Sequence, residues 1–143
     1  MYLLDTNICI YVLKHHSDSL RHRFKVTRNL AISAITYAEL CFGIEHGASS
    51  LRRKRWQQLG AFTRLLLVLP FDDEAGRHYG FVRAHLQRQG RPIGNNDLLI
   101  ASQARSLNAV LVTNNEREFL RVPDLTVENW AGGRGQSGGQ GSE

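Results

Sequence analysis

The sequence predicts an α/β fold in which helices cover both faces of a parallel β-sheet. Short apolar runs with the composition of buried strands alternate with helical patterns, which is typical of strand–helix–strand units. Gly and Pro residues separate these segments, as at Gly47, Pro70 and Gly90. The length of 143 residues suits one domain, and 42% hydrophobic with 22% charged residues is typical of a globular chain.

The first half of the chain shows the alternation clearly. An apolar run at residues 2–4 ends on Asp5 and predicts a buried strand, and the apolar pattern at 7–15 predicts a helix. After a polar, basic stretch, a second strand is expected at 30–35 and a second helix at 37–46.

The second half repeats the pattern with a strongly basic helical segment first. The expected helices are 50–65, 73–89 and 96–107, and the expected strands are 66–69, 109–113 and 125–128. Right-handed crossovers would place the carboxyl ends of all parallel strands along one edge of the sheet.

Domain boundaries follow from composition. We expect residues 1–131 to form the domain and the Gly-rich residues 132–143 to form a flexible tail, because that composition cannot build a core. No apolar run has the length of a membrane span and no cleavable leader is visible, so a cytoplasmic protein is expected. Cys9 and Cys41 lie in apolar helical patterns and are expected to be reduced.

Three acidic residues lie at junctions between elements: Asp5, Glu39 and Asp97. Each alone has a structural explanation, since Asp can cap a helix and both acids favour the positive end of a helix. Together at one sheet edge they would repel one another unless neutralised, and Mg²⁺ or Mn²⁺ suits such an oxygen site. The chain has no phosphate-binding loop, no dinucleotide fingerprint and no Gly-x-Ser-x-Gly nucleophile turn.

The charge distribution points to an anionic partner. The net charge is +5, and the densest cluster of cations contains Arg52, Arg53 and Arg55 beside Trp56. This cluster is either a solvated helix face or a surface that contacts tRNA phosphates, with Trp56 packing or stacking. Arg91 precedes Asp97 in a loop and would reach a phosphate beside the acidic site.

In order along the chain, these segments resemble the successive motifs of PIN-domain ribonucleases. The matching segments are Leu3-Leu4-Asp5-Thr6-Asn7, residues 33–40, residues 94–101 and Val112-Thr113-Asn114-Asn115. More narrowly, the chain resembles the VapC toxins of bacterial type II toxin–antitoxin pairs, through residues 88–94, 113–119 and 127–130. The likeness spans about residues 1 to 130.

The resemblance implies a PIN-like three-layer fold with a five-stranded parallel sheet in the order 3-2-1-4-5. It implies Mg²⁺-dependent hydrolysis of RNA phosphodiester bonds, with Mn²⁺ as a substitute, and inhibition by a VapB-type antitoxin. The loop Gly90-Arg91-Pro92-Ile93-Gly94 is similar to that of the subgroup that cuts initiator tRNA in the anticodon loop. A homodimer that does not associate with membranes is expected as well.

The family's acidic positions fall on Asp5, Glu39 and Asp97, whereas the fourth position is Asn115. Asp5 and Asp97 would hold the metal, with Glu39 binding it directly or through water. Asn115 carries no charge but can hydrogen-bond a water at the metal. Glu116 and Glu118 are close enough in sequence to supply the charge that Asn115 lacks, unless the direction of the helix points them away. The expected substrate-binding residues are Thr6, Asn7, Arg91, Thr113, Arg52, Arg53 and Arg55, although Thr6 and Thr113 also suit caps or turns.

Two other function classes remain open from the sequence. One is a module that binds RNA or antitoxin without turnover, for which Asn115 is the best support. The other is a metal-dependent DNA nuclease, because the same carboxylate chemistry cleaves either nucleic acid.

Overall fold

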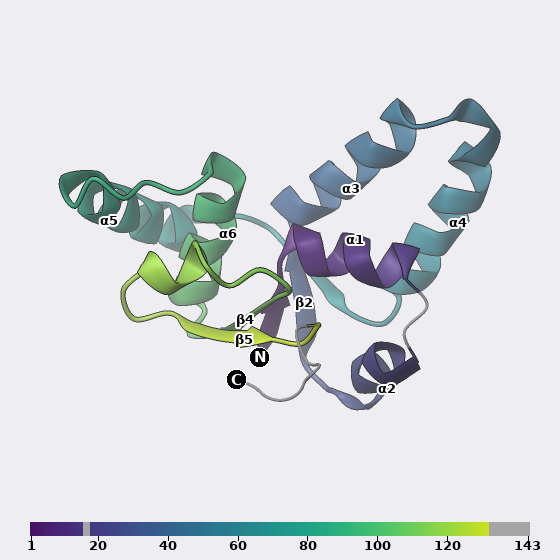
Figure 1. The fold of residues 1–143 in the computed structure, drawn as a ribbon, viewed down its shortest axis with the longest axis horizontal. Helices are drawn as coiled ribbons and strands as arrows, with labels where there is room; N and C mark the ends of the chain where they lie inside the picture. Colours follow the sequence, from purple (N-terminus) through teal and green to yellow (C-terminus); the bar gives the residue numbers. More distant parts are fainter. Residues whose placement is uncertain (16–17, 132–143) are drawn as a thin grey trace.

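In the computed structural model, which describes residues 1–15 and 18–131, five parallel strands form a single sheet in the order β3-β2-β1-β4-β5 (Figure 1). Both the fold class and the predicted strand order are confirmed. The register pairs Leu3 of the central strand with Ala31 on one side and Leu111 on the other. The strands are β1 Tyr2–Leu4, β2 Leu30–Ser33, β3 Leu67–Leu69, β4 Val110–Thr113 and β5 Thr126–Asn129.

The central strand is covered on both faces. Leu3 and Leu4 point to opposite sides of the sheet, and both are 0% exposed. Leu4 belongs to a core cluster with residues of α1 to α4, whereas Leu3 belongs to a second cluster with residues of α5 and α6. The helices are α1 Thr6–Lys14, α2 Asp18–Val26, α3 Ala34–His46, α4 Arg52–Thr63, α5 Asp73–Arg88 and α6 Asn95–Ser106, with short 3₁₀ helices at Ser49–Leu51 and Phe119–Arg121.

Helix α2 was missed by the sequence prediction, which assigned no element to this stretch. Of its nine residues only Leu20 and Phe24 are buried, so the apolar stripe is a single i, i+4 pair. Phe24 packs near Phe62 and Trp130, and this tertiary contact supports a helix that its polar sequence does not indicate.

Helix α3 begins at Ala34, three residues earlier than predicted, and β2 ends at Ser33 rather than at residue 35. The Ser33 hydroxyl accepts a hydrogen bond from the Ile35 N–H at 3.0 Å, which starts the helix there. Glu39 therefore lies in the second turn of α3, whereas the predicted helix at 37–46 placed it in the first turn.

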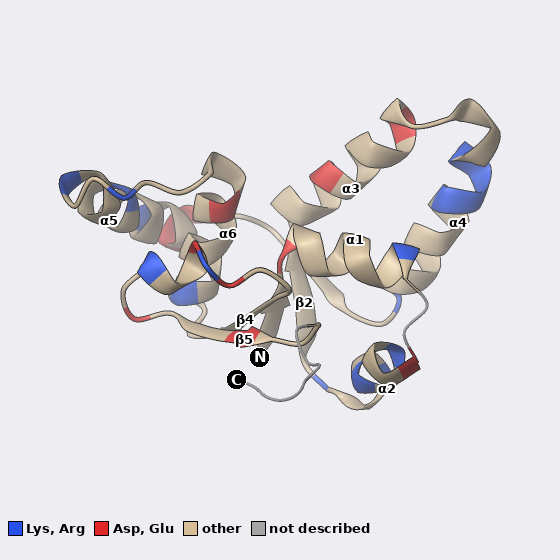
Figure 2. Cartoon of the chain, in the orientation of Figure 1, with Lys and Arg blue, Asp and Glu red and all other residues tan. Residues whose placement is uncertain are grey.

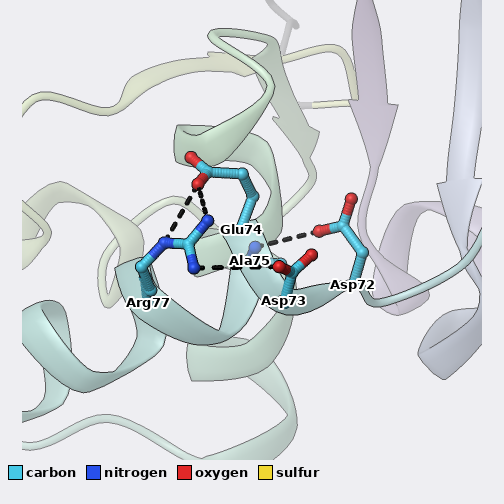
Figure 3. A network of polar contacts seen from close by, with 5 residues as sticks. All are labelled: Asp72, Asp73, Glu74, Ala75 and Arg77. Atoms are coloured by element: carbon cyan, nitrogen blue, oxygen red, sulfur yellow. Dashed lines mark hydrogen bonds and ion pairs between the residues drawn. The ribbon is translucent and has the colours of Figure 1, made fainter.

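Polar contacts among acidic residues and an arginine stabilise the first turn of helix α5 (Figure 3). The carboxylate of Asp72 accepts a hydrogen bond from the Ala75 N–H at 3.0 Å, and Arg77 pairs with Asp73 and Glu74 one turn further along. The helix packs on α6, and these two helices lie on one side of the carboxyl end of β1 while α3 and α4 lie on the other (Figure 1).

The predicted tail, residues 132–143, lies outside the described residues. Within residues 1–15 and 18–131, no helix is both long enough and apolar enough to cross a membrane. Cys9 and Cys41 are both free thiols; Cys9 is buried, while Cys41 is partly exposed.

Candidate active site

Asp5 directly follows β1 and is only 1% exposed. One carboxylate oxygen accepts a hydrogen bond from the Ile8 N–H at 2.8 Å. Asp5 is therefore the N-cap of α1, which is the structural role that the sequence allowed for it. The other oxygen accepts one from the Thr113 hydroxyl at 2.5 Å, because β4 is the neighbour of β1 and Thr113 is its last residue. Burial, opposed by these two hydrogen bonds, raises the pKa of Asp5 to about 6, and the charge of Glu39 adds to the increase.

Asp97 lies in the first turn of α6 and is partly buried. Its pKa is raised to about 7, first by burial, then by the hydrogen bond to Glu118 and the charge of that residue, and then by the charges of Asp5 and Glu39. The predicted acidic triplet is therefore brought within electrostatic reach, together with a fourth carboxylate from the segment after β4.

Glu39 reaches this group from the second turn of α3. The Thr6 hydroxyl donates to its Oε1 at 2.6 Å, and the Asn96 side-chain amide donates to its Oε2. Thr6 also contacts Thr36 through its hydroxyl at 3.1 Å. Both oxygens of Glu39 therefore have a donor, one on α1 and one on α6.

Glu118 is a fourth carboxylate that the structure brings to the acidic group. Asn115 is exposed, and its backbone N–H donates to the Thr113 hydroxyl oxygen at 2.9 Å. Glu118 is partly buried, interacts with Asp97 and accepts a 3.5 Å hydrogen bond from the Gly94 N–H. The sequence indicated that Glu116 or Glu118 could supply the missing charge, but spacing alone could not decide which of the two reaches the site.

The remaining predicted residues near this edge differ in exposure. Thr113 is buried and bonded to Asp5, Thr6 is partly buried and bonded to Glu39, and Asn7 is exposed in the first turn of α1. Arg91 is exposed in the loop before α6, with its N–H bonded to the Leu86 carbonyl at 2.9 Å.

The cations of α4 lie together near the start of the helix (Figure 2), but they differ in exposure. Arg52 donates to the Glu45 carbonyl at 3.2 Å and pairs with its carboxylate at 3.7 Å. Trp56 donates to the same carboxylate at 2.9 Å and packs against the core, so the packing alternative holds for Trp56. Arg55 lies against Gly47, whereas Arg53 and Lys54 are exposed.

The donor set suits a hard divalent cation. In the described part of the chain, no three His, Cys, Asp or Glu side chains form a ready-made metal site. Mg²⁺, however, is usually held by one or two carboxylates and keeps several waters, so the Asp5 and Asp97 oxygens fit it in kind. Asn114, the residue directly after β4, has a buried side-chain oxygen without a hydrogen-bond partner.

Comparison with known proteins agrees with this geometry. The PIN domain family model matches residues 2–125. Ribonuclease VapC2 of Rickettsia felis is 41% identical over 133 residues, which cover 91% of this chain and 98% of that protein. The tRNA(fMet)-specific endonuclease VapC of Shigella flexneri is 41% identical over 131 residues, with the same two coverages.

Among solved structures, DNA-bound VapBC from Salmonella typhimurium matches with a TM-score of 0.86 and 39% identity, covering 91% of this chain and 98% of the matched chain. VapBC2 from Rickettsia felis, bound to a promoter DNA fragment, matches with a TM-score of 0.83 and 41% identity over 90% and 98% of the two chains. The chain therefore belongs to the PIN-domain family and, within it, to the VapC ribonucleases.

Proposed function

We propose that this protein is the toxin of a type II toxin–antitoxin pair and a metal-dependent endoribonuclease that cuts initiator tRNA in the anticodon loop. The observation that carries the proposal is the acidic group of Asp5, Glu39, Asp97 and Glu118, which a basic chain gathers where β1 ends. The names of the Shigella and Salmonella relatives, tRNA(fMet)-specific endonucleases, support the substrate. The cytoplasm, where tRNA resides, is the inferred compartment.

In this proposal Asp5 and Asp97 hold Mg²⁺, or Mn²⁺ in its place, and Glu118 supplies the negative charge that Asn115 lacks at the fourth position. A divalent cation bound there would act as a Lewis acid, which would activate water and offset charge on the scissile phosphate. Thr113 holds the Asp5 carboxylate through its 2.5 Å hydrogen bond, and Thr6 holds Glu39 through its 2.6 Å hydrogen bond. The exposed Asn7 and Arg91 are placed to contact RNA phosphates.

The partner in this proposal is a VapB-type antitoxin, as in the solved VapBC complexes. A cavity of about 230 Å³ between α1, α3 and α4 supports it. Half of its lining residues are aliphatic, including Ile10, Leu40 and Leu59, and the charged residues Lys14, Glu39 and Arg55 also line it. An apolar segment bound there would therefore lie directly beside the acidic group and would obstruct it.

The direct test is cleavage of initiator tRNA by the purified protein with Mg²⁺ or Mn²⁺, compared with an elongator tRNA and a single-stranded DNA. We expect a single cut in initiator tRNA, loss of that cut with EDTA, and no cut in DNA. Cleavage of DNA would favour the nuclease alternative, and binding of RNA without cleavage would favour the non-catalytic one.

Glu118→Gln provides the residue-level arm of this test, with Glu116→Gln as the matched control. Glu118 faces Asp97, whereas Glu116 is exposed two residues away. We expect Glu118→Gln to reduce the rate of cleavage strongly and Glu116→Gln to leave it unchanged. Equal rates in both variants would remove Glu118 from the proposed site.

A further inference from the structure

Helix α6 begins with two asparagines whose side chains reach different neighbours. Asn95 accepts a hydrogen bond from the Tyr79 hydroxyl of α5 at 3.1 Å. Asn96 donates its side-chain amide to Oε2 of Glu39, which belongs to α3. Because α3 and α6 lie on opposite sides of the end of β1 (Figure 1), the second contact joins the two sides of the candidate active site.

The contact between Asn96 and Glu39 is directional. An ionised carboxylate only accepts hydrogen bonds, so the amide nitrogen of Asn96, and not its oxygen, must face Glu39. The Thr6 hydroxyl occupies the other oxygen of Glu39 at 2.6 Å. A carboxylate with a donor on each oxygen is fixed in both position and plane, whereas a single donor would leave it free to rotate.

The contact between Asn96 and Glu39 opposes an electrostatic repulsion. Glu39 on α3 and Asp97 on α6 are like-charged neighbours, and their repulsion favours moving the two helices or the two side chains apart. Asn96 is a neutral donor that precedes Asp97 in the chain and holds the Glu39 carboxylate towards α6 against that repulsion.

We propose that Asn96 is a positioning residue that holds the Glu39 carboxylate beside Asp97, so that α3 and α6 present their carboxylates together to a divalent cation. This inference rests on the proposed function. Residues that orient carboxylate ligands typically change metal affinity by about 10- to 100-fold when removed. Asn96 touches neither the cation nor the RNA in this account and acts through Glu39.

The test is a double-mutant cycle on Mn²⁺ affinity, measured by calorimetry on the full-length protein. We expect Asn96→Ala to raise the Mn²⁺ dissociation constant by roughly tenfold. In a Glu39→Ala background the same substitution should have no further effect, because the group it positions is gone. Asn95→Ala is the matched control, on the same helical turn but bonded to Tyr79, and should leave the dissociation constant unchanged.

A cleavage assay then separates positioning from a general loss of structure. With Asn96→Ala, saturating Mn²⁺ should restore most of the RNA cleavage that is lost at low Mn²⁺, which a misfolded variant would not show. Equal effects of Asn96→Ala in both backgrounds, or an equal effect of Asn95→Ala, would overturn the inference. The inference would also be overturned if the unmodified protein bound no Mn²⁺. An unmodified protein that binds Mn²⁺ but cuts no RNA would overturn the proposed function, and the cycle would still decide the role of Asn96.

Discussion

Asp5 and Asp97 are carboxyl groups in surroundings that disfavour their charged form when no counter-ion is bound. Their pKa values in the folded protein are about 6 and about 7, against an ordinary value of 3.8. Between about pH 4 and pH 7 the folded protein therefore binds more protons than the unfolded chain, and its stability falls as the pH rises through that window. A divalent cation would offset the same charges, so the residues proposed for chemistry also weaken the fold when no cation is bound.

This leads to a prediction for the protein kept in EDTA. Asp97→Asn, which removes one of these charges, should melt at a higher temperature than the unmodified protein at pH 8, and the difference should shrink towards pH 5. The measurement is thermal unfolding at several pH values, with saturating Mn²⁺ as a second series. Saturating Mn²⁺ should stabilise the unmodified protein more than the variant. A variant that is less stable at every pH would contradict the assigned cause.

At the scale of elements, α1, α3 and α4 form a groove that can be tested through one glycine. Gly43 lines the cavity of about 230 Å³, and a Cβ built there meets no atom within 4 Å. Gly43→Leu should therefore fold normally, with a small gain in helix stability of about 0.5–1 kcal/mol, while its side chain fills the cavity.

We expect Gly43→Leu to keep RNA cleavage and to lose inhibition by the cognate antitoxin. The measurement is the antitoxin concentration that halves cleavage. Gly80→Leu is the control, because Gly80 is equally open but lies on α5. Full inhibition of Gly43→Leu would place the antitoxin elsewhere on the surface.

The elements also show what the sequence could reveal. The first four strands were predictable as short apolar runs next to helical patterns, the fifth was expected as a last short strand, and the order of the sheet followed from the family resemblance. Helix α2 was not predictable, since two buried residues leave no periodic pattern in a polar segment. The early start of α3 depends on the Ser33 cap, and a Ser after a strand-like run is compatible with either state.

At the scale of the whole molecule, the predicted acidic residues converge because the parallel topology brings distant segments to one edge. Asp5 and Asp97 could be chosen from their positions at element ends, and Glu39 from its predicted place in a first helical turn, although the structure puts it in the second turn of α3. Glu118 could be named but not separated from Glu116, since the separation depends on the turn that follows β4. Asn96 carried no sequence signal, because its partner Glu39 lies 57 residues away in the chain.

The charge of the surface is the other feature of the whole molecule. The cations of α4, which are adjacent in the sequence, have different surroundings in the structure. Arg52 is engaged with Glu45 and Arg55 lies against Gly47, so both support the packing of α3 on α4. Arg53 and Lys54 are exposed and remain available to RNA phosphates. RNA affinity should therefore depend on the second pair and stability on the first.

We predict that Arg53→Gln with Lys54→Gln weakens tRNA binding and reduces the slope of log affinity against log salt by about 0.7 to 0.9 for each phosphate that the protein no longer neutralises. The single-turnover rate at saturating tRNA should persist, because the carboxylates are intact. Lys25→Gln with Arg28→Gln removes the same charge from exposed positions in and just after α2 and is the control. If both double variants reduce the slope equally, net charge alone steers the RNA. If neither does, the RNA approaches over Arg91 and the loop before α6, and Arg91→Gln becomes the variant to measure.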